Sequence, residues 1–167
     1  ALASKDQKRY GEISARLSEL SSKFGNNVMD ATLAWHKHIT DEADLAGLPE
    51  SALALAADTA KSKELDGWVF TLDFPSYLPI MTYADNRELR KETYTAFSTR
   101  ASDQGPNAGE FDNSDIMKEE LALRHELAQL LGFKSYAEKS LATKMAETPE
   151  QVFSFLEDLA AKSKPQA

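Results

Sequence analysis

The sequence contains no cysteine, only three histidines and no long apolar run. The lack of cysteine excludes a disulfide framework and a thiolate metal site, which fits a cytoplasmic protein. Aspartate and glutamate outnumber lysine and arginine by 27 to 19, giving a net charge of -8, and no basic block stands apart from acidic neighbours. Partners such as nucleic acid or an anionic membrane surface would require such a block. We therefore expect no nucleic acid and no membrane among the partners.

The sequence also shows no signal for secretion or for insertion into a membrane. The first residues have no apolar core of the kind a signal peptide carries, and no stretch approaches the roughly 18 apolar residues of a membrane span. A chain of 167 residues suits one domain with one sizeable core. We predict a soluble, cytoplasmic protein with a single domain over residues 1–167.

Between Lys5 and Ile39 the apolar residues recur with an average spacing of about 3.6, the period of an α-helix. They are Tyr10, Ile13, Leu17, Leu20, Phe24, Val28, Ala31, Trp35 and Ile39. The stripe keeps its phase across Gly25-Asn26-Asn27, which predicts one unbroken helix. Such a helix would span about 52 Å, against a diameter of roughly 40 Å for a compact chain of this size. Either the molecule is elongated or it is a piece of something larger, and the missing initiating methionine favours the second.

Local signals at their ends predict the remaining elements. Gly67 and Pro75 bound a run of aromatic and β-branched residues, which predicts one short strand or hairpin near residues 68–73. Pro75 and Pro79 are expected to enclose a turn or a single helical turn. Further helices are expected after Pro49, from Asp85 or Asn86, from Asn113 or Ser114 to Leu131 with Gly132 as its C-terminal cap, and at capping boxes that begin at Ser135 and Thr148. The predicted fold class is mainly α, an elongated helical bundle of about seven helices.

The stretch RHELAQLLGF begins a zinc-peptidase signature at His125-Glu126 and does not complete it. In H-E-x-x-H the two histidines lie one helical turn apart and share one zinc, while the glutamate acts on water. Position 129 is glutamine, a poor zinc ligand, and Lys118 shares the polar helix face with His125. We interpret His125 as a surface histidine on an amphipathic helix.

His36 and His38 form the other histidine pair. On a continuing helix, positions i and i+2 point about 200° apart and cannot hold one ion, so chelation would need a locally extended backbone. The favoured interpretation is two imidazoles near a helix C-terminus, where positive charge is mildly stabilised. A free-standing metalloenzyme using His36, His38 and His125 is the least favoured alternative.

Glu120 and Arg124 form an i,i+4 pair that falls, at about 60° and 100°, inside the apolar arc centred near Leu123. One interpretation is a partly buried ion pair with apolar stems. The other is that this edge faces a polar channel or the other half of a larger protein. Glu120 and Arg124 are thus the candidate site residues for a channel edge.

An ordered series of segments resembles the thimet oligopeptidase family of zinc metallopeptidases from about Tyr10 to the C-terminus. The segments are GLPESALALAADTA, FTLDFPSYLPIMTYADNRELRKETYTAFSTRASDQG, LALRHELAQLLGF and KSYAEKSLATKMAETPEQVFSFLEDLA. The resemblance implies a longer, mostly helical parent with two halves flanking a narrow channel. It also implies zinc as the parent's cofactor, held by an H-E-x-x-H helix and a downstream glutamate.

This sequence has no position that matches those zinc ligands or the catalytic glutamate. We therefore expect a non-catalytic fragment, the upstream helical wall of a cytoplasmic peptidase that hydrolyses short peptides, with no zinc of its own and unknown substrate-binding residues. Its expected partners are the rest of the peptidase chain and, in the parent, short peptides. A stand-alone helical protein-interaction module is the alternative, because the long amphipathic helix could dock a partner helix.

Overall fold

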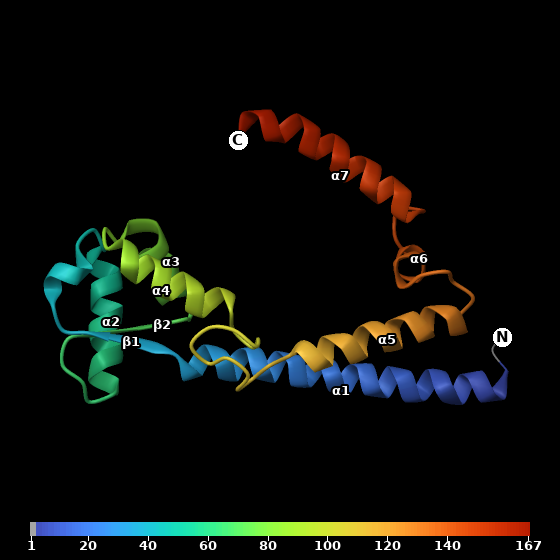
Figure 1. The fold of residues 1–167 in the computed structure, drawn as a ribbon, viewed down its shortest axis with the longest axis horizontal. Coiled ribbons are helices and arrows are strands. Elements are labelled where there is room, and N and C mark those ends of the chain that lie inside the picture. The colour runs from blue at the N-terminus through green and yellow to red at the C-terminus, as the bar shows by residue number, and fades with distance from the viewer. Residues whose placement is uncertain (1–2) are drawn as a thin grey trace. The chain divides into compact units, whose positions relative to one another are not determined.

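A computed structural model describes residues 3–167, and within them the chain is mainly α, as predicted (Figure 1). Seven α-helices, two short 3-10 helices and one two-stranded antiparallel sheet are present among these residues. In chain order they are α1 (Ser4–Ala34), β1 (His36–Ile39), η1 (Glu42–Leu45), α2 (Glu50–Ser62), β2 (Trp68–Thr71), α3 (Phe74–Tyr83), α4 (Arg87–Ser98), α5 (Ser114–Leu130), α6 (Tyr136–Leu141), α7 (Pro149–Ser163) and η2 (Lys164–Gln166). None of the helices in this described part is both long and apolar enough to cross a membrane.

The chain divides into two compact units. The central unit comprises residues 21–116, and the terminal unit comprises residues 1–20 together with 117–167. Helices α1 and α5 each contribute residues to both units. The prediction of a single domain stays a prediction.

Helix α1 continues without interruption through Gly25-Asn26-Asn27, as the apolar stripe predicts. The sequence prediction was wrong at its C-terminal end, because the helix stops at Ala34 and His36–Ile39 is strand β1. The strand pairs with β2, with His36 opposite Thr71 and Ile39 opposite Trp68. Backbone pairing with a strand that lies 29 to 35 residues further along the chain is a tertiary effect, which helical spacing does not reveal.

Because Gly25 lies inside α1 with nothing within 4 Å of an added Cβ, replacing it should stabilise the helix. Gly25→Ala is expected to raise the free energy of unfolding by about 0.5–1 kcal/mol, since alanine loses less backbone entropy than glycine in a helix. Urea denaturation followed by circular dichroism measures the change. Gly11→Ala, in equally open space on α1, is the matched control and should give a similar gain; a loss at position 25 alone would contradict an unbroken helix there.

The core of the central unit lies between the sheet, α2 and α3. It contains Ile39, Leu45, Leu48, Ala56, Phe70, Ile80, Ala84 and Leu89. Helix α2 buries three alanines spaced four residues apart, Ala52, Ala56 and Ala60, so a stripe of small side chains lets it contact β2 closely. Phe70 is buried in this cluster and Trp68 packs against it partly buried, while a second cluster of the same unit contains Trp35, Leu72 and Ala96 with Phe97 packed against them.

Helix α3 corrects a second expectation, because residues 74–83 form ten helical residues rather than a turn or a single helical turn. Pro75 falls in the first turn, where a missing N–H has no consequence, and Pro79 is tolerated inside the helix. The next helix begins as predicted. The side chain of Asn86 caps α4 by accepting hydrogen bonds from the backbone N–H groups of Glu88 and Leu89, both at 3.1 Å.

A buried asparagine joins α1 to the loop before α5 within the central unit. Asn113 is 1% exposed; its Nδ2 donates to the backbone oxygen of Phe24 at 3.2 Å, and its Oδ1 accepts from Nδ2 of Asn27 at 2.8 Å. Its backbone N–H donates to the carbonyl of Ala101 at 3.0 Å. The asparagine in the middle of α1 is therefore explained by a partner 86 residues away.

Candidate functional site

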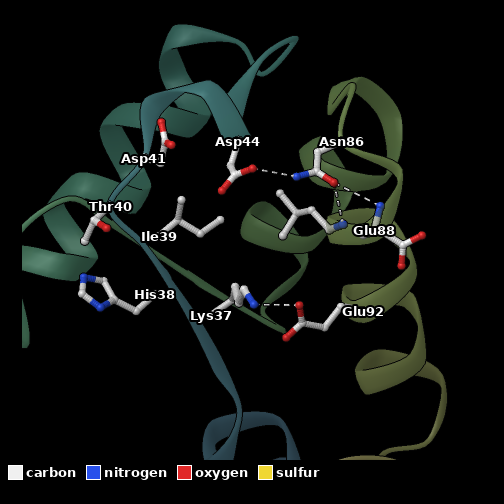
Figure 2. Close-up of a pocket in the computed structure, with 10 residues that line it drawn as sticks. Lys37, His38, Ile39, Thr40, Asp41, Asp44, Asn86, Glu88 and Glu92 are labelled. Carbon is white, nitrogen blue, oxygen red and sulfur yellow. Dashed lines mark hydrogen bonds and ion pairs between the residues drawn. The ribbon is translucent and has the colours of Figure 1, made fainter.

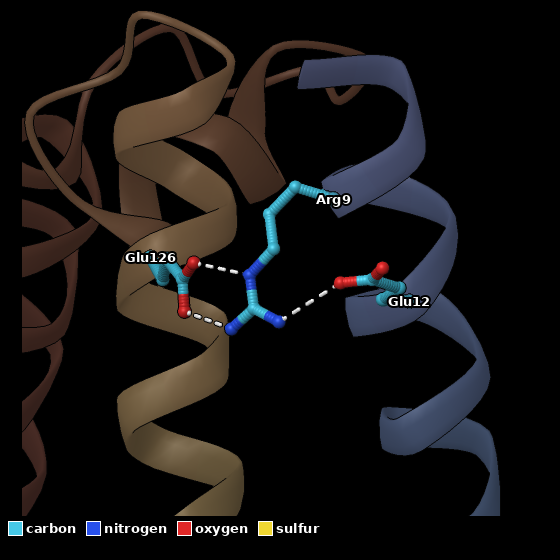
Figure 3. A network of polar contacts seen from close by, with 3 residues as sticks. All are labelled: Arg9, Glu12 and Glu126. Atoms are coloured by element: carbon cyan, nitrogen blue, oxygen red, sulfur yellow. Dashed lines mark hydrogen bonds and ion pairs between the residues drawn. The ribbon is translucent and has the colours of Figure 1, made fainter. Parts of the chain in front are cut away.

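The incomplete zinc-peptidase motif lies on the part of α5 that belongs to the terminal unit. His125 is exposed there, as expected for a surface histidine, and Gln129 donates a hydrogen bond to the carbonyl oxygen of Lys134 at 2.9 Å. Glu126, which would correspond to the glutamate that acts on water, is instead paired with an arginine of α1 (Figure 3).

Arg9 holds both carboxylate oxygens of Glu126 through one edge of its guanidinium, the edge formed by Nε and Nη2. Its Nε donates to Oε1 at 2.6 Å and its Nη2 donates to Oε2 at 2.8 Å, while Nη1 donates to Glu12 at 3.3 Å. This parallel pair of bonds is the strong fork geometry of arginine and carboxylate. Hydrogen bonding to Arg9 holds the pKa of Glu126 below its ordinary value, so Glu126 is a poor proton acceptor at neutral pH and functions here as a brace.

The same arrangement recurs seven residues along each helix. Arg16 donates from Nε to Oε1 of Glu119 at 2.6 Å and from Nη2 to Oε2 at 2.8 Å, and its Nη1 lies 2.8 Å from Glu19. We call the Arg9–Glu126 and Arg16–Glu119 pairs the two clamps. Sequence reasoning missed them, although R-x-x-E occurs at 9–12 and again at 16–19, opposite two glutamates that are also seven residues apart.

The Arg9–Glu126 clamp should show a favourable coupling in a double-mutant cycle. We expect the double variant Arg9→Ala/Glu126→Ala to lose less free energy of unfolding than the sum of the losses in the two single variants. Because both side chains are 44% exposed, the coupling should shrink when salt is added. Urea denaturation midpoints at low and high salt measure it. The exchanged variant Arg9→Glu/Glu126→Arg is the control for charge pairing; equal coupling at both salt concentrations would contradict an electrostatic origin.

The same clamp predicts a pH dependence. A carboxyl group with a lowered pKa in the folded state stabilises the fold above its unfolded pKa, near 4.3 for glutamate. That stabilisation is lost as the pH falls through the folded value. Glu126→Gln should therefore be less stable than the parent chain at pH 7, and the difference should vanish toward pH 2; a difference that persists in acid would contradict the assignment.

The predicted edge pair forms a direct contact in the terminal unit. Glu120 is only 8% exposed, and its Oε2 lies 3.0 Å from Nη2 of Arg124, whose side chain is 39% exposed. The guanidinium of Arg124 also lies over the ring of Tyr136, 5.6 Å from its centre. The contact matches a partly buried ion pair, and whether this edge meets a channel or another half stays a prediction.

The histidine pair lies in a different setting from the one expected. His36 and His38 belong to strand β1 rather than to a helix C-terminus, and on a strand positions i and i+2 share one face. Nε2 of His38 is 2.6 Å from the backbone oxygen of Asp66. Among residues 3–167 no group of three or more histidine, aspartate or glutamate side chains could hold a metal ion. The residues present therefore do not fit a zinc site.

One pocket of the central unit lies between β1, η1 and α4, with a volume of about 330 Å³ (Figure 2). Its polar groups are largely paired with one another. Nζ of Lys37 lies 2.8 Å from Glu92, and Nδ2 of Asn86 donates to Asp44 at 3.1 Å. Its remaining charged groups are mostly carboxylates, so this pocket is acidic.

A second pocket lies on the other side of α4 and has the opposite charge. Its volume is about 440 Å³, and it is lined by Met81, Arg87, Arg90, Lys91 and Tyr94. Sequence reasoning missed this site because basic and acidic residues alternate in RELRKE. A helical projection of that segment would have separated them.

Comparison with known proteins identifies a matching family and similar sequences. The model of peptidase family M3 matches residues 80–167. Over 99% of this chain the sequence is 66% identical to Oligopeptidase A of Escherichia coli, and over 97% it is 46% identical to the probable cytosolic oligopeptidase A of Arabidopsis thaliana. A dipeptidyl carboxypeptidase of Escherichia coli is 29% identical over 99% of the chain.

The chain spans about a quarter of the length of these curated relatives, 24% in each of the three. The family match covers more than half of the chain, and the similarity to Oligopeptidase A extends across both compact units. These findings confirm the resemblance drawn from the sequence segments: the chain belongs to peptidase family M3.

Proposed function

We propose that residues 1–167 form a non-catalytic helical domain of a cytoplasmic, zinc-dependent oligopeptidase that hydrolyses short peptides in a narrow channel. The observation that carries the proposal is the 66% identity to Oligopeptidase A over 99% of this chain, which covers 24% of that relative. The M3 family match supports the peptidase class. The partners in this proposal are the remainder of the peptidase chain and its short peptide substrates.

The zinc in this proposal is bound by parts of the peptidase other than these residues. The only near match to a zinc motif here, His125-Glu126, has its glutamate in the Arg9 clamp. In this proposal no residue of this chain takes part in the hydrolytic step. Its contribution is structural: it supports the channel wall, and the Glu120–Arg124 edge is the proposed surface toward the remaining part.

A chimera tests the proposal directly. The segment of Escherichia coli Oligopeptidase A that aligns with this chain is replaced by residues 1–167, and cleavage of a quenched-fluorescent peptide is measured. We expect kcat/KM within about tenfold of the parent enzyme, a change of about 1.4 kcal/mol or less in the activation free energy. A chimera that folds and binds zinc but shows no turnover would contradict the proposed role.

The isolated 167-residue chain provides the complementary measurement. We expect no peptide cleavage and no stoichiometric zinc by elemental analysis. Tight one-to-one zinc binding with turnover would overturn the non-catalytic assignment. An inactive chimera together with a well-folded isolated chain would instead favour the alternative, a stand-alone helical protein-interaction module.

A further inference from the structure

Helix α4 separates its charges into two faces. Taking Arg87 as 0° and about 100° per residue, Arg90, Lys91 and Tyr94 fall at about 300°, 40° and 340°. Glu88 and Glu92 fall at about 100° and 140°, on the adjacent face that lines the acidic pocket (Figure 2). The alternating sequence thus becomes a basic stripe beside an acidic one.

The basic stripe lines a pocket that contains no acidic side chain. Arg87, Arg90 and Lys91 supply three positive charges, and Met81 of α3 with Tyr94 supplies apolar surface. The volume of about 440 Å³ falls within the range of pockets that bind small ligands, about 300–1,000 Å³. Such a concentration of positive charge is unexpected in a chain with a net charge of -8.

These cations are not neutralised within the described part of the chain. On the acidic face, Lys37 pairs with Glu92 at 2.8 Å, and in the terminal unit Arg9 is paired through a fork. By contrast, no carboxylate of residues 3–167 forms an ion pair with Arg87, Arg90 or Lys91. The pocket therefore has unused positive charge.

Arg90 is held in place by the end of α3. Its Nη1 donates to the backbone oxygen of Ala84 and, at 3.1 Å, to that of Asp85. The side chain is half-buried, whereas Arg87 and Lys91 are exposed. An arginine that is already ordered loses less entropy on binding, and its planar group can receive a carboxylate through two parallel bonds.

We propose that this basic pocket of α4 binds the carboxylate groups of a short acidic peptide. The apolar surface of Met81 and Tyr94 favours an organic carboxylate over an inorganic anion. The apolar atoms of an organic ligand gain binding free energy by contacting this surface, whereas an inorganic anion has no such atoms. The acidic face next to the pocket disfavours a long polyanion such as nucleic acid, since Glu88 and Glu92 would repel its continuation. The choice of a peptide as ligand rests on the proposed function.

Peptide binding to the full 167-residue chain tests the proposal. The probe is an N-acetylated, C-amidated tetraglutamate peptide, titrated at low salt while backbone amide chemical shifts are recorded. We expect saturable chemical-shift changes at residues 87–94, and we expect the affinity to fall as the salt concentration is raised to about 0.15 M. Two further arms identify the carboxylate source: a tetraalanine peptide with a free C-terminus tests the terminal carboxylate, and tetraglutamine with both ends blocked is the neutral control. Absence of saturable shifts at these residues with tetraglutamate would overturn the proposal, and shifts with tetraalanine alone would do so as well, because that peptide has no acidic side chain.

Two double variants locate the site. Arg87→Ala/Lys91→Ala should weaken binding of the carboxylate peptide at least tenfold, whereas Lys5→Ala/Lys8→Ala, which removes the same charge from exposed positions of α1, should change it less than twofold. Arg90→Lys keeps the charge and should still weaken binding severalfold, because the planar fork is lost.

Equal weakening by both double variants would overturn the site, since it would reveal a general charge effect. Inorganic phosphate that binds residues 87–94 as tightly as tetraglutamate would overturn the peptide assignment. These readouts are independent of turnover by the chimera, so a failed chimera and a failed binding site are distinguishable.

Discussion

Replacing Phe70 by alanine should lower the free energy of unfolding by about 3–5 kcal/mol. Phe70 is 1% exposed, lies in the middle of the central core and comes from the strand that pairs with β1. Its removal deletes a large buried apolar surface and leaves a cavity, which the rigid sheet and α2 can fill only partly. Chemical denaturation followed by circular dichroism gives the difference.

Phe74 supplies the matched control for this change. It begins α3 and is 60% exposed, so Phe74→Ala should alter the free energy of unfolding by less than about 1 kcal/mol. If the two phenylalanine variants were destabilised to the same degree, the sheet would not form the centre of this core. The comparison holds residue type constant and varies only burial.

Gly67→Ala should have the second-largest effect, a loss of about 2–4 kcal/mol. Gly67 precedes β2 with a φ of 81°, and an added Cβ would lie 2.4 Å from the backbone oxygen of Ile39, the last residue of β1. Alanine is strained at that φ, and the clash is with backbone rather than with a flexible side chain. The backbone strain and the clash both act at the end of the sheet where Ile39 of β1 lies beside the residue that precedes β2.

Gly109 separates the two contributions. Its φ is 79°, but nothing lies within 4 Å of an added Cβ, so Gly109→Ala carries the backbone strain without the clash. We expect a loss of about 1–2 kcal/mol there. A thermal denaturation series of the parent and both variants measures the difference, and an equal loss at both positions would show that Ile39 moves away without penalty.

Local signals allowed much of the fold to be predicted, because the groups that carry them lie within one turn of each other. The Asn86 cap of α4 and the caps of α6 and α7 at Ser135 and Thr148 are confirmed. So is the end of α5, where Gly132 adopts a φ of 82° and the N–H of Phe133 reaches the carbonyl of Ala128 at 2.9 Å.

The misjudged elements depend on partners far away in the sequence. The apolar spacing of Trp35 and Ile39 fits a helix, but it is also compatible with a strand once β2 is available to pair. The prolines of α3 suggested a turn when considered alone, whereas Ile80 is fully buried in the core and holds the segment as a helix. Tertiary contacts outweighed local preference at both places.

The candidate site divides in the same way. The contact between Glu120 and Arg124 follows from an i,i+4 spacing and is therefore visible in the sequence. The basic pocket requires Met81 of α3 beside α4, and the clamps require helices more than 100 residues apart in the chain. Neither arrangement has a local signature strong enough to be recognised alone.

The two clamps also restrict how α1 and α5 can align within the terminal unit. Each arginine meets its glutamate so that the two residue numbers have a constant sum, as antiparallel helices require. Sliding one helix by seven residues would bring Arg16 to Glu126 but leave Arg9 and Glu119 without these fork partners. Every shifted alignment loses at least one of the two forked ion pairs. These polar surface contacts therefore specify one alignment of α1 with α5, which apolar side chains alone would leave ambiguous.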